Sequence, residues 1–426
     1  MPYEEGLAGE RTRAILAETY GAGGVDAALD RMKALARRLS AETPGARGGE
    51  PRFYSAPGRT ELGGNHTDHN HGRVLAAAVG LDALACVLPR PPADPGVRIL
   101  SEGWPDPIVV DLSDLEPRAS EAGGTAALVR GVARGLADRG IAPRGFDATI
   151  ASTVLPGSGL SSSAAVEVLL GAILADLAGA KVDPVELAKI GQFAENRFFL
   201  KPCGLMDQTT SAVGGIVAID FGDPAAPLVR RLDFDFRAAG LVLAVVNTGG
   251  SHADLTDDYA AVPAEMKAVA AFLGKGALRE VPPGLLVERG PEIRAACGDR
   301  ALLRALHFAA EDARVPEMAA ALESGDLAAY LRLVKASGDS SWRLLQNLYP
   351  PAAPAEQGLS LALALTEGHL AGEGAARVHG GGFAGTIQAY VPATRFEGWK
   401  ALMERYFGAG SVMPLDARPV GATRLL

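Results

Sequence analysis

The sequence of 426 residues contains little cysteine and no excess of basic residues, and each absence excludes a class of protein. Only three cysteines occur, and Cys86, Cys203 and Cys297 lie far apart. An odd number at these spacings forms neither a disulfide framework nor a zinc-ligand pattern, which fits a reducing cytoplasm. Lysine and arginine number 41 against 50 aspartates and glutamates, and the net charge is −9. Nucleic acid is therefore not expected as a main partner, because phosphate contacts require clustered basic side chains.

Long hydrophobic segments are also missing. The longest apolar runs, such as residues 166–180, carry Glu167 and Asp176 and are too short to span a bilayer. The first 21 residues are charged and lack the apolar core of a signal peptide. We therefore predict a cytoplasmic protein with no membrane partner. A composition of 48% hydrophobic and 21% charged residues is typical of a folded chain. The oligomeric state stays open, with a monomer as one option.

Strand and helix signals alternate along both halves of the chain. Residues 1–48 have near-helical apolar spacing, and residues 51–64 are predicted as a short strand broken at Pro57-Gly58. Asp183-Pro184 predicts a helix start, since Asp is a good N-cap and Pro suits the first helical position. Further strands are expected over 73–90, 146–156, 214–221, 241–247, 386–392 and 411–416, and helical segments over 166–177, 184–199, 260–375 and 394–408. The alternation predicts an α+β protein with two domains, residues 1–230 and 231–426.

The stretch ELGGNHTDHNHG, Glu61 to Gly72, holds three histidines and one aspartate between glycines. These side chains could bind a metal, bind a substrate or fill a turn. A His-x-Asp-His metal site needs further ligands from elsewhere in the chain. The remaining histidines, at positions 252, 307, 369 and 379, form no companion motif. The residues alone leave the three interpretations open.

The stretch LPGSGLSSSAAVEV places Gly157 and Gly159 between a predicted strand and an amphipathic helix that three serines open. Such a turn directs free backbone N–H groups and the positive end of the helix dipole toward an anion. Glycine allows the backbone to approach phosphate oxygens, and serine hydroxyls can donate to phosphate or bind Mg²⁺. The segment lacks Gly-Lys-Ser/Thr, so it is not a Walker loop. An ordinary Gly/Ser turn before a helix is the alternative.

Two acidic residues follow this loop, Glu195 in AENRFF and Asp207 in CGLMDQTTS. An isolated aspartate is usually a cap or turn former. Phosphoryl transfer to an alcohol, however, requires Mg²⁺ ligands and an acceptor for the hydroxyl proton, which gives acids beside a phosphate-type loop a chemical purpose. A third glycine-rich segment, RVHGGGFAGTIQAYV, predicts either a close backbone approach to a ligand or a bulged hairpin.

Taken in this order, these segments resemble the GHMP small-molecule kinases, and within them the galactokinase family. GRTELGGNHTDHNHGRVL is similar to the signature Gly-Arg-x-Asn-Leu-x-Gly-Glu-His-x-Asp-Tyr-x-x-Gly-x-Val-Leu, and PGSGLSSSA is similar to the phosphate-binding loop. AENRFFLKPCGLMDQ resembles the segment with the catalytic aspartate, and RVHGGGFAGT resembles the third motif. The resemblance covers most of residues 52–425. It implies a ribosomal-S5-domain-2-like N-terminal domain and a ferredoxin-like α+β C-terminal domain, with the active site in the cleft between them.

The resemblance also implies a reaction, the ATP- and Mg²⁺-dependent phosphorylation of the anomeric C1 hydroxyl of a monosaccharide, with galactose as the first candidate. Asp207 would accept or orient the hydroxyl proton, and Arg59 would hold Asp207 ionised and counter the charge of the transferring group. The implied sugar contacts are Arg59, Asn65, His66, Asp68, Gly204, Asp207 and Tyr259. The implied ATP contacts are Pro156, Gly157, Ser158, Gly159, Leu160, Ser161, Ser162 and Ser163. Ser162 or Ser163, with Glu195, would bind Mg²⁺.

The chain departs from the family pattern at positions that affect sugar choice. The Glu of the signature is Asn65 here, and its Asn is Glu61. His69 and His71 stand where the family has Tyr and often Asp, and are interpreted as loop residues. An amide that replaces a carboxylate acceptor can leave a buried group unpaired at about 1–3 kcal/mol. Kinase activity is therefore a firmer prediction than galactose as the substrate.

Three alternatives accompany the galactokinase interpretation. The first is a GHMP kinase for a different sugar or sugar derivative, which the exchange at Asn65 motivates. The second is a sensor that binds sugar and ATP without turnover, although the presence of Arg59, Glu195 and Asp207 speaks against it. The third is a metal-dependent hydrolase built on the histidine-rich stretch.

Overall fold

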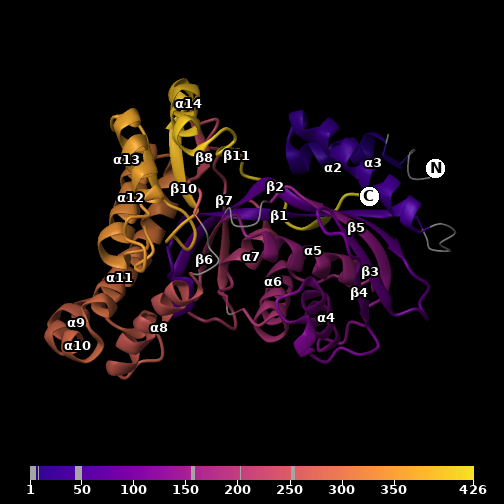
Figure 1. Cartoon of the computed structure of the whole chain (residues 1–426), viewed down its shortest axis with the longest axis horizontal. Coiled ribbons are helices and arrows are strands. Elements are labelled where there is room, and N and C mark those ends of the chain that lie inside the picture. Colours follow the sequence, from indigo (N-terminus) through magenta and orange to yellow (C-terminus); the bar gives the residue numbers. More distant parts are fainter. Residues whose placement is uncertain (1–5, 8, 44–49, 155–158, 202, 251–254) are drawn as a thin grey trace.

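A computed structural model describes residues 6–7, 9–43, 50–154, 159–201, 203–250 and 255–426. Two β-sheets with flanking helices form its frame (Figure 1). The larger sheet comes from the N-terminal half plus one short strand near the C-terminus, and the smaller sheet comes from the C-terminal half. None of the helices in these ranges combines the length and hydropathy needed to cross a bilayer.

The larger sheet is built around two long antiparallel strands, β1 and β2, whose residues are almost all buried. Its order is β12-β1-β2-β5-β3-β4, and β6 pairs with β2 and with β7. The 17-residue strand β2 is long enough to pair with β6 in its first part and with β5 in its last part. The strands of this sheet are β1 Arg52–Gly63, β2 Arg73–Pro89, β3 Gly96–Ser101, β4 Ile108–Asp111, β5 Phe146–Ser152, β6 Ile216–Asp220, β7 Leu228–Leu232 and β12 Thr423–Arg424.

Helices cover both faces of the larger sheet (Figure 1). On one face, α4–α7 pack on the sheet and form the main hydrophobic core. On the other face, α2 and α3 bury Leu16, Leu29 and Met32 against Phe53 and Cys86. A sheet covered on both faces requires nearly continuous apolar strands, as β1 and β2 have. The helices are α2 Glu10–Tyr20, α3 Val25–Glu42, α4 Thr125–Ala137, α5 Ser162–Leu177, α6 Pro184–Ala194 and α7 Met206–Val213.

The smaller sheet has the order β11-β8-β10-β9 and also lies between two apolar layers. One face packs with α13 and α14 around Trp399 and Met403, which form a separate core. The other face contributes Leu243 and Tyr390 to the main core of the larger sheet, together with Tyr330 of α12. One continuous core therefore joins the two sheets. The elements are β8 Leu241–Asn247, β9 Ala375–Val378, β10 Thr386–Pro392, β11 Val412–Leu415, α12 Leu327–Ser340, α13 Gly358–Leu370 and α14 Phe396–Phe407.

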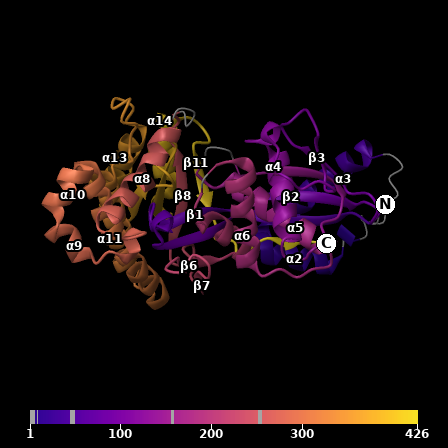
Figure 2. The same ribbon diagram turned by 90° about the horizontal axis from the view of Figure 1, so that it is seen from below.

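Four further helices form a compact group at the end of the molecule opposite the N-terminus (Figure 2). Their own hydrophobic cluster includes Met266, Phe308 and Phe383. The longest of them, α11, also contacts β1 and β2, which links the group to the larger sheet. These helices are α8 Thr256–Phe272, α9 Pro283–Glu288, α10 Gly290–Cys297 and α11 Asp299–Ser324.

The observed architecture confirms the predicted α+β class but differs from one expectation in detail. Residues 51–64 are not a short strand broken at Pro57-Gly58; β1 runs unbroken from Arg52 to Gly63, with a register shift between Pro57 and Arg59. A β-bulge accommodates proline, because the inserted residue leaves the hydrogen-bond ladder. The domain boundary near residue 230 stays a prediction; β7 ends at Leu232 and β8 begins at Leu241.

Candidate active site

The bulge in β1 positions the arginine at the centre of the candidate site. The segment that resembles the phosphate-binding loop is described over residues 159–163 and is called the phosphate loop below. Gly58 allows it to lie directly on β1, because a side chain there would meet the Leu160 carbonyl oxygen at 2.7 Å. The Arg59 N–H donates to the same carbonyl oxygen at 3.0 Å. Arg59 Nε and Nη2 each donate to Asp207 at 2.7 Å, which makes a bidentate ion pair between β1 and α7. Arg59 Nη1 also donates to the Gly159 carbonyl oxygen.

This arrangement keeps Asp207 ionised. Burial acts to raise the pKa of Asp207, but the positive charge of Arg59 and the hydrogen bonds from Arg59 and Ser161 outweigh it, so the pKa lies below the ordinary value. About a third of the Asp207 side chain, 31%, stays exposed, whereas only 8% of Arg59 is exposed. A ligand can therefore reach the carboxylate while the guanidinium remains fixed behind it.

The phosphate loop meets this pair at the N-terminus of α5. Ser161 precedes the helix with a left-handed φ of 59° and donates its hydroxyl to Asp207. Gly159 has a φ of 71° and lies against His379, where a Cβ would approach the imidazole at 2.9 Å. Leu160 is buried beneath the loop. Pro156, Gly157 and Ser158, which are also predicted to bind ATP, lie outside the described residues.

A second carboxylate lies beside the first turn of α5. Glu195 begins a π-helical turn, Glu195–Phe199, that directly follows α6, and it accepts a hydrogen bond from Ser163 Oγ at 3.2 Å. Such turns occur frequently at functional sites. Gln208 Nε2, next to Asp207, donates to Glu195 at 3.0 Å. Ser162, the first residue of α5, is partly exposed at the same helix end.

Sequence reasoning missed a third carboxylate at this position, Glu167. Gln208 Nε2 donates to Glu167 at 2.9 Å as well as to Glu195, and therefore joins the two acids. Burial first, and then the charge of Glu195, raise the pKa of Glu167 well above its ordinary value, which favours its neutral form. One signal was available in the sequence. Glu167 shares the apolar face of α5 with Leu170 and Leu174, where an acid is unexpected.

The histidine loop, residues 64–72, places His66 beside Gly381 and Asp68 beside Gly204, in the segment before α7. His66 has a φ of 60° and lies 3.0 Å from the Gly381 carbonyl oxygen through Nε2. Burial lowers the pKa of His66 to about 3, so the ring is neutral. Because a carbonyl only accepts, Nε2 carries the hydrogen and Nδ1 is the acceptor. Asp68 packs on Gly204, where a Cβ would come 1.7 Å from its carboxylate.

Asn65 is buried, and protein groups hold both ends of its amide. Its Nδ2 donates to Glu61 at 3.1 Å and to the Gly380 carbonyl oxygen at 2.8 Å. Its Oδ1 accepts from Ser341 at 3.2 Å and from Asn347 at 3.0 Å. The predicted sugar contact at this position therefore has four partners from the chain itself.

The glycine loop, residues 379–385, brings the smaller sheet to the site. It connects β9 and β10 and therefore forms a hairpin. Tyr259 of α8 donates to the Gly382 carbonyl oxygen at 3.0 Å, and its ring lies edge-on to Phe383. A Cβ at Gly381 would meet the Tyr259 ring at 2.4 Å, so glycine permits this contact. Burial, and then the charge of Asp258, raise the pKa of Tyr259 to about 12.

His379 is a further residue that the sequence did not indicate. It is buried between Thr60 of β1 and Thr386 of β10, with ring nitrogens 2.9 and 3.0 Å from their hydroxyl oxygens. Burial, and then the charges of Arg59 and Arg377, hold the pKa of His379 well below its usual value. A neutral ring thus joins the two sheets directly behind the phosphate loop. In the described parts of the chain, no three His, Cys, Asp or Glu side chains converge as a metal-binding group.

Two family models match the segments that form this site. The GHMP kinases N-terminal domain matches residues 127–215, which hold the phosphate loop, Glu195 and Asp207. The galactokinase galactose-binding signature matches residues 45–89, which hold Arg59 and the histidine loop.

Curated relatives extend the similarity to most of the chain. A galactokinase of Streptomyces coelicolor is 36% identical over 394 residues, which cover 89% of this chain and 96% of the relative. A galactokinase of Actinobacillus pleuropneumoniae is 32% identical over 351 residues, which cover 80% and 85% of the two chains. The chain therefore belongs to the galactokinase family of the GHMP kinases.

Solved structures support the same fold. The galactokinase of Lactococcus lactis, determined with galactose, has a TM-score of 0.78 at 23% identity and covers 92% of this chain and 99% of its own. A mevalonate kinase has a TM-score of 0.61 at 14% identity, with 86% and 99% covered. The two-sheet frame is thus shared beyond the galactokinases.

Proposed function

We propose that the protein transfers the γ-phosphoryl group of ATP to the C1 hydroxyl of galactose, in the cytoplasm. The observation that carries this proposal is the convergence of three motifs on Asp207. Arg59 from the galactose-binding signature, Ser161 from the phosphate loop and Asp207 itself from α7 are directly hydrogen-bonded. A sugar hydroxyl at Asp207 and a phosphate at the N-terminus of α5 would therefore be neighbours.

Asp207 would receive the hydrogen bond of the reacting hydroxyl. Its depressed pKa makes it a weak base, so its main contribution is to orient the hydroxyl and to stabilise the proton as it leaves. The sugar oxygen then attacks the γ-phosphorus, the bond to the β-phosphate oxygen breaks, and ADP leaves. The bound proton returns to solvent after the product departs.

Arg59 contributes positive charge where negative charge accumulates. Arg59 is buried, and its guanidinium is held by Asp207 and the Gly159 carbonyl oxygen, so it needs no reorganisation during transfer. Its position between the phosphate loop and the carboxylate suits it to both the phosphoryl group and Asp207.

The residues near Glu195 fit a Mg²⁺ ion, which in kinases neutralises the phosphate charge. Ser163 and Glu195 supply a hydroxyl and a carboxylate within 3.2 Å of each other, and such oxygen atoms are the ligands that Mg²⁺ prefers. Ser162 stands beside them on the same helix end. Lys201 Nζ, 3.6 Å from Glu195, would compete with the cation for this carboxylate.

The sugar would lie between Asp207, the histidine loop and Tyr259. His66 offers Nδ1 as an acceptor, and Asp68 offers a carboxylate held beside Gly204. The Asn65 amide is bound to protein groups and not directed at the sugar. Asn65 would therefore affect the sugar indirectly, by anchoring the histidine loop.

The test is ADP release with Mg-ATP over a panel of galactose, glucose, N-acetylgalactosamine, arabinose, fucose, glucuronate and galacturonate. We expect galactose to be preferred and Asp207→Asn to reduce kcat by about a thousandfold or more while ATP affinity changes little. The matched control is Asp147→Asn, which breaks a comparable bidentate pair with Arg90 far from the site.

Each other result decides between named alternatives. Turnover of a different sugar would retain the kinase and replace the substrate. Binding of galactose and ATP without turnover would favour a sensor. An Asp207→Asn variant with the kcat of the parent protein would refute the role given to this carboxylate.

A further inference from the structure

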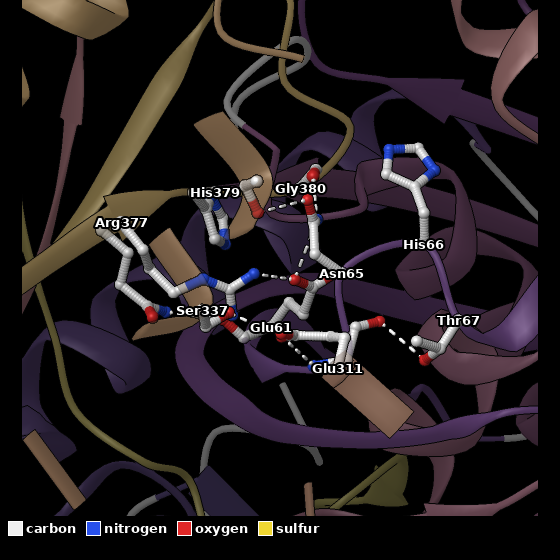
Figure 3. A network of polar contacts seen from close by, with 12 residues as sticks. Glu61, Asn65, His66, Thr67, Glu311, Ser337, Arg377, His379 and Gly380 are labelled. Atoms are coloured by element: carbon white, nitrogen blue, oxygen red, sulfur yellow. Dashed lines mark hydrogen bonds and ion pairs between the residues drawn. The ribbon is translucent and has the colours of Figure 1, made fainter. Parts of the chain in front are cut away.

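A buried ion pair joins the two sheets next to Asn65 of the histidine loop (Figure 3). Arg377 of β9 is fully buried and donates Nη2 to Glu61 of β1, whose side chain is only 4% exposed. Arg377 Nε and Nη1 have no hydrogen-bond partner among the described residues. The cation therefore depends on Glu61 for its direct contact, because a buried charge without a partner is strongly destabilising.

Asn65 connects this ion pair to the histidine loop, in which it lies, and to the glycine loop. Its Nδ2 bridges the Glu61 carboxylate and the Gly380 carbonyl oxygen, at 3.1 and 2.8 Å, and thus ties β1 to the glycine loop (Figure 3). The next residue, His66, reaches the neighbouring carbonyl oxygen of Gly381. The position of the His66 ring is therefore fixed by the same contacts that place Glu61 and Arg377.

Other groups hold the backbone of the loop around Asn65. His307 Nε2 lies 2.9 Å from the Asn65 carbonyl oxygen. Glu311 accepts the Gly64 N–H at 3.1 Å. It also accepts the Ser337 hydroxyl at 2.6 Å (Figure 3). Both groups that touch the loop belong to α11, and Ser337 of α12 holds Glu311 in place, so helices anchor the loop in addition to the contact of Asn65 with Glu61.

The amide and the carboxylate stand in the reverse order to the family signature, which has Asn at position 61 and Glu at position 65. Since Glu61 and Asn65 touch each other, the exchange keeps one carboxylate and one amide in a single contact. The carboxylate has moved along the chain toward Arg377 and away from the histidine loop.

We propose that Glu61, Asn65 and Arg377 act together as positioning residues that set the affinity of the chain for its sugar. The inference rests on the proposed function, because it assigns to this site a determinant of sugar binding. None of the three side chains is placed at the reacting atoms. Glu61 holds Arg377, Asn65 connects Glu61 to the glycine loop, and this connection orders His66 for the sugar.

A double-mutant cycle with isosteric substitutions tests the proposal. Asn65→Asp places a second carboxylate next to Glu61 and opposite the Gly380 carbonyl oxygen, so we expect the sugar KM to rise by about tenfold or more. Glu61→Gln removes the charge that Arg377 requires and should raise the same KM. The double variant moves the single carboxylate from position 61 to position 65. Its sugar KM should be at least about threefold lower than that of Asn65→Asp alone.

The ratio of two KM values separates positioning from general destabilisation. The KM for ATP should change by less than about twofold in each variant. Glu367→Gln, which breaks an exposed ion pair with Lys335, is the control and should leave both KM values unchanged. If Glu61→Gln does not fold, Arg377→Lys takes its place. It keeps the buried positive charge but alters the contact with Glu61, and its sugar KM and ATP KM are compared in the same way.

The proposal is overturned if the sugar KM of the double variant equals the product of the two single effects. It is also overturned if the KM values for sugar and for ATP rise together. The cycle uses whichever sugar the parent protein phosphorylates. If no sugar is turned over, sugar affinity is measured by calorimetry. Failure of galactose as a substrate and failure of the positioning role are thus distinguishable.

Discussion

Arg59 connects three segments of the candidate site. Its three guanidinium nitrogens contact Asp207 twice and the Gly159 carbonyl oxygen once, so one side chain connects β1, α7 and the phosphate loop. Lysine, with a single ammonium group, cannot reproduce this planar fork. The charge state of Asp207 and the position of the phosphate loop therefore depend on the same residue.

The pH dependence of activity follows from this contact. With Arg59 present, the pKa of Asp207 is below its ordinary value of 3.8, and the carboxylate stays ionised throughout weakly acidic solution. In Arg59→Met, burial is no longer outweighed and the pKa of Asp207 should rise above 3.8. We expect a lower kcat and an acid limb of the kcat/KM profile that moves to higher pH.

The measurement is the kcat/KM profile of both proteins between pH 4 and pH 8. Arg90→Met, which breaks the bidentate pair with Asp147 away from the site, is the control and should leave the profile in place. If the acid limb of Arg59→Met lies at the same pH as in the parent protein, Arg59 does not lower the pKa of Asp207. The linked stability has a definite sign: a depressed pKa stabilises the folded state above the unfolded pKa, and this contribution is lost as pH falls through the folded pKa.

The resemblance to the family motifs, rather than residue types and spacing alone, predicted the residues that meet here. Arg59, Ser161 and Asp207 lie in three motifs separated by many residues, and the structure brings them into direct contact. The partners of Asn65 could not be predicted. Apart from Glu61, they come from the π-helical turn Ser341–Leu345, from Asn347 just after it and from the glycine loop, and only the packing of the two sheets decides which of them approach.

At the scale of elements, close approach of one segment to another decides the shape of the site. Gly204 lies in the short connection before α7 and lets this segment pack on the histidine loop. Gly381 does the same for α8 at Tyr259. In both cases the missing side chain, rather than backbone flexibility, is what the contact requires.

Gly204→Ala should therefore damage sugar binding. The new methyl group would stand 1.7 Å from the Asp68 carboxylate, so this proposed sugar contact must leave its position. We expect the sugar KM to rise by about tenfold or more with a smaller effect on the KM for ATP. Gly368→Ala in α13, where nothing lies within 4 Å, is the control. Steady-state kinetics with each substrate varied in turn would refute the expectation if the two variants behaved alike.

Element types were predicted better than their connections. Apolar patterns identified β2 and most helices, because such patterns are a local property, whereas β1 was predicted as a short, broken strand. The bulge at Pro57-Gly58 was interpreted as a break, since local signals for a turn and for a bulge are the same. The π-helical turns at Glu195 and Ser341 leave no signal in apolar spacing, although each supplies a residue to the site region.

At the scale of the whole molecule, a buried charge cluster holds the N-terminal helices to the larger sheet. Asp82 is fully buried and lies 2.7 Å from Arg31 of α3 and 3.5 Å from the buried Arg418. It also accepts hydrogen bonds from Tyr20 of α2 and Ser55 of β1. Segments from both ends of the chain thus share one carboxylate.

Asp82→Asn should lower the free energy of unfolding by about 3 kcal/mol, because it leaves two arginines without their common counter-charge. The KM values should stay unchanged, since the Asp82 side chain contacts α2 and α3, on the face of the sheet opposite to α5 and α7 (Figure 1). Urea-induced unfolding measures the effect. Glu373→Gln, which breaks an exposed pair with Arg395, should cost less than about 1 kcal/mol. Equal losses in the two variants would show that the cluster contributes no more than a surface pair.

Strand β12 has a consequence for how the protein is made. It pairs with β1 at Tyr54 and Ser55, although several hundred residues separate the two strands in the sequence. A ribosome adds about 5–20 residues per second, so this edge of β1 stays open for tens of seconds while the smaller sheet is synthesised. An open strand edge invites pairing with other chains. Chaperones that shield nascent polypeptides would therefore be needed most during this interval, until the final strand arrives and closes the sheet.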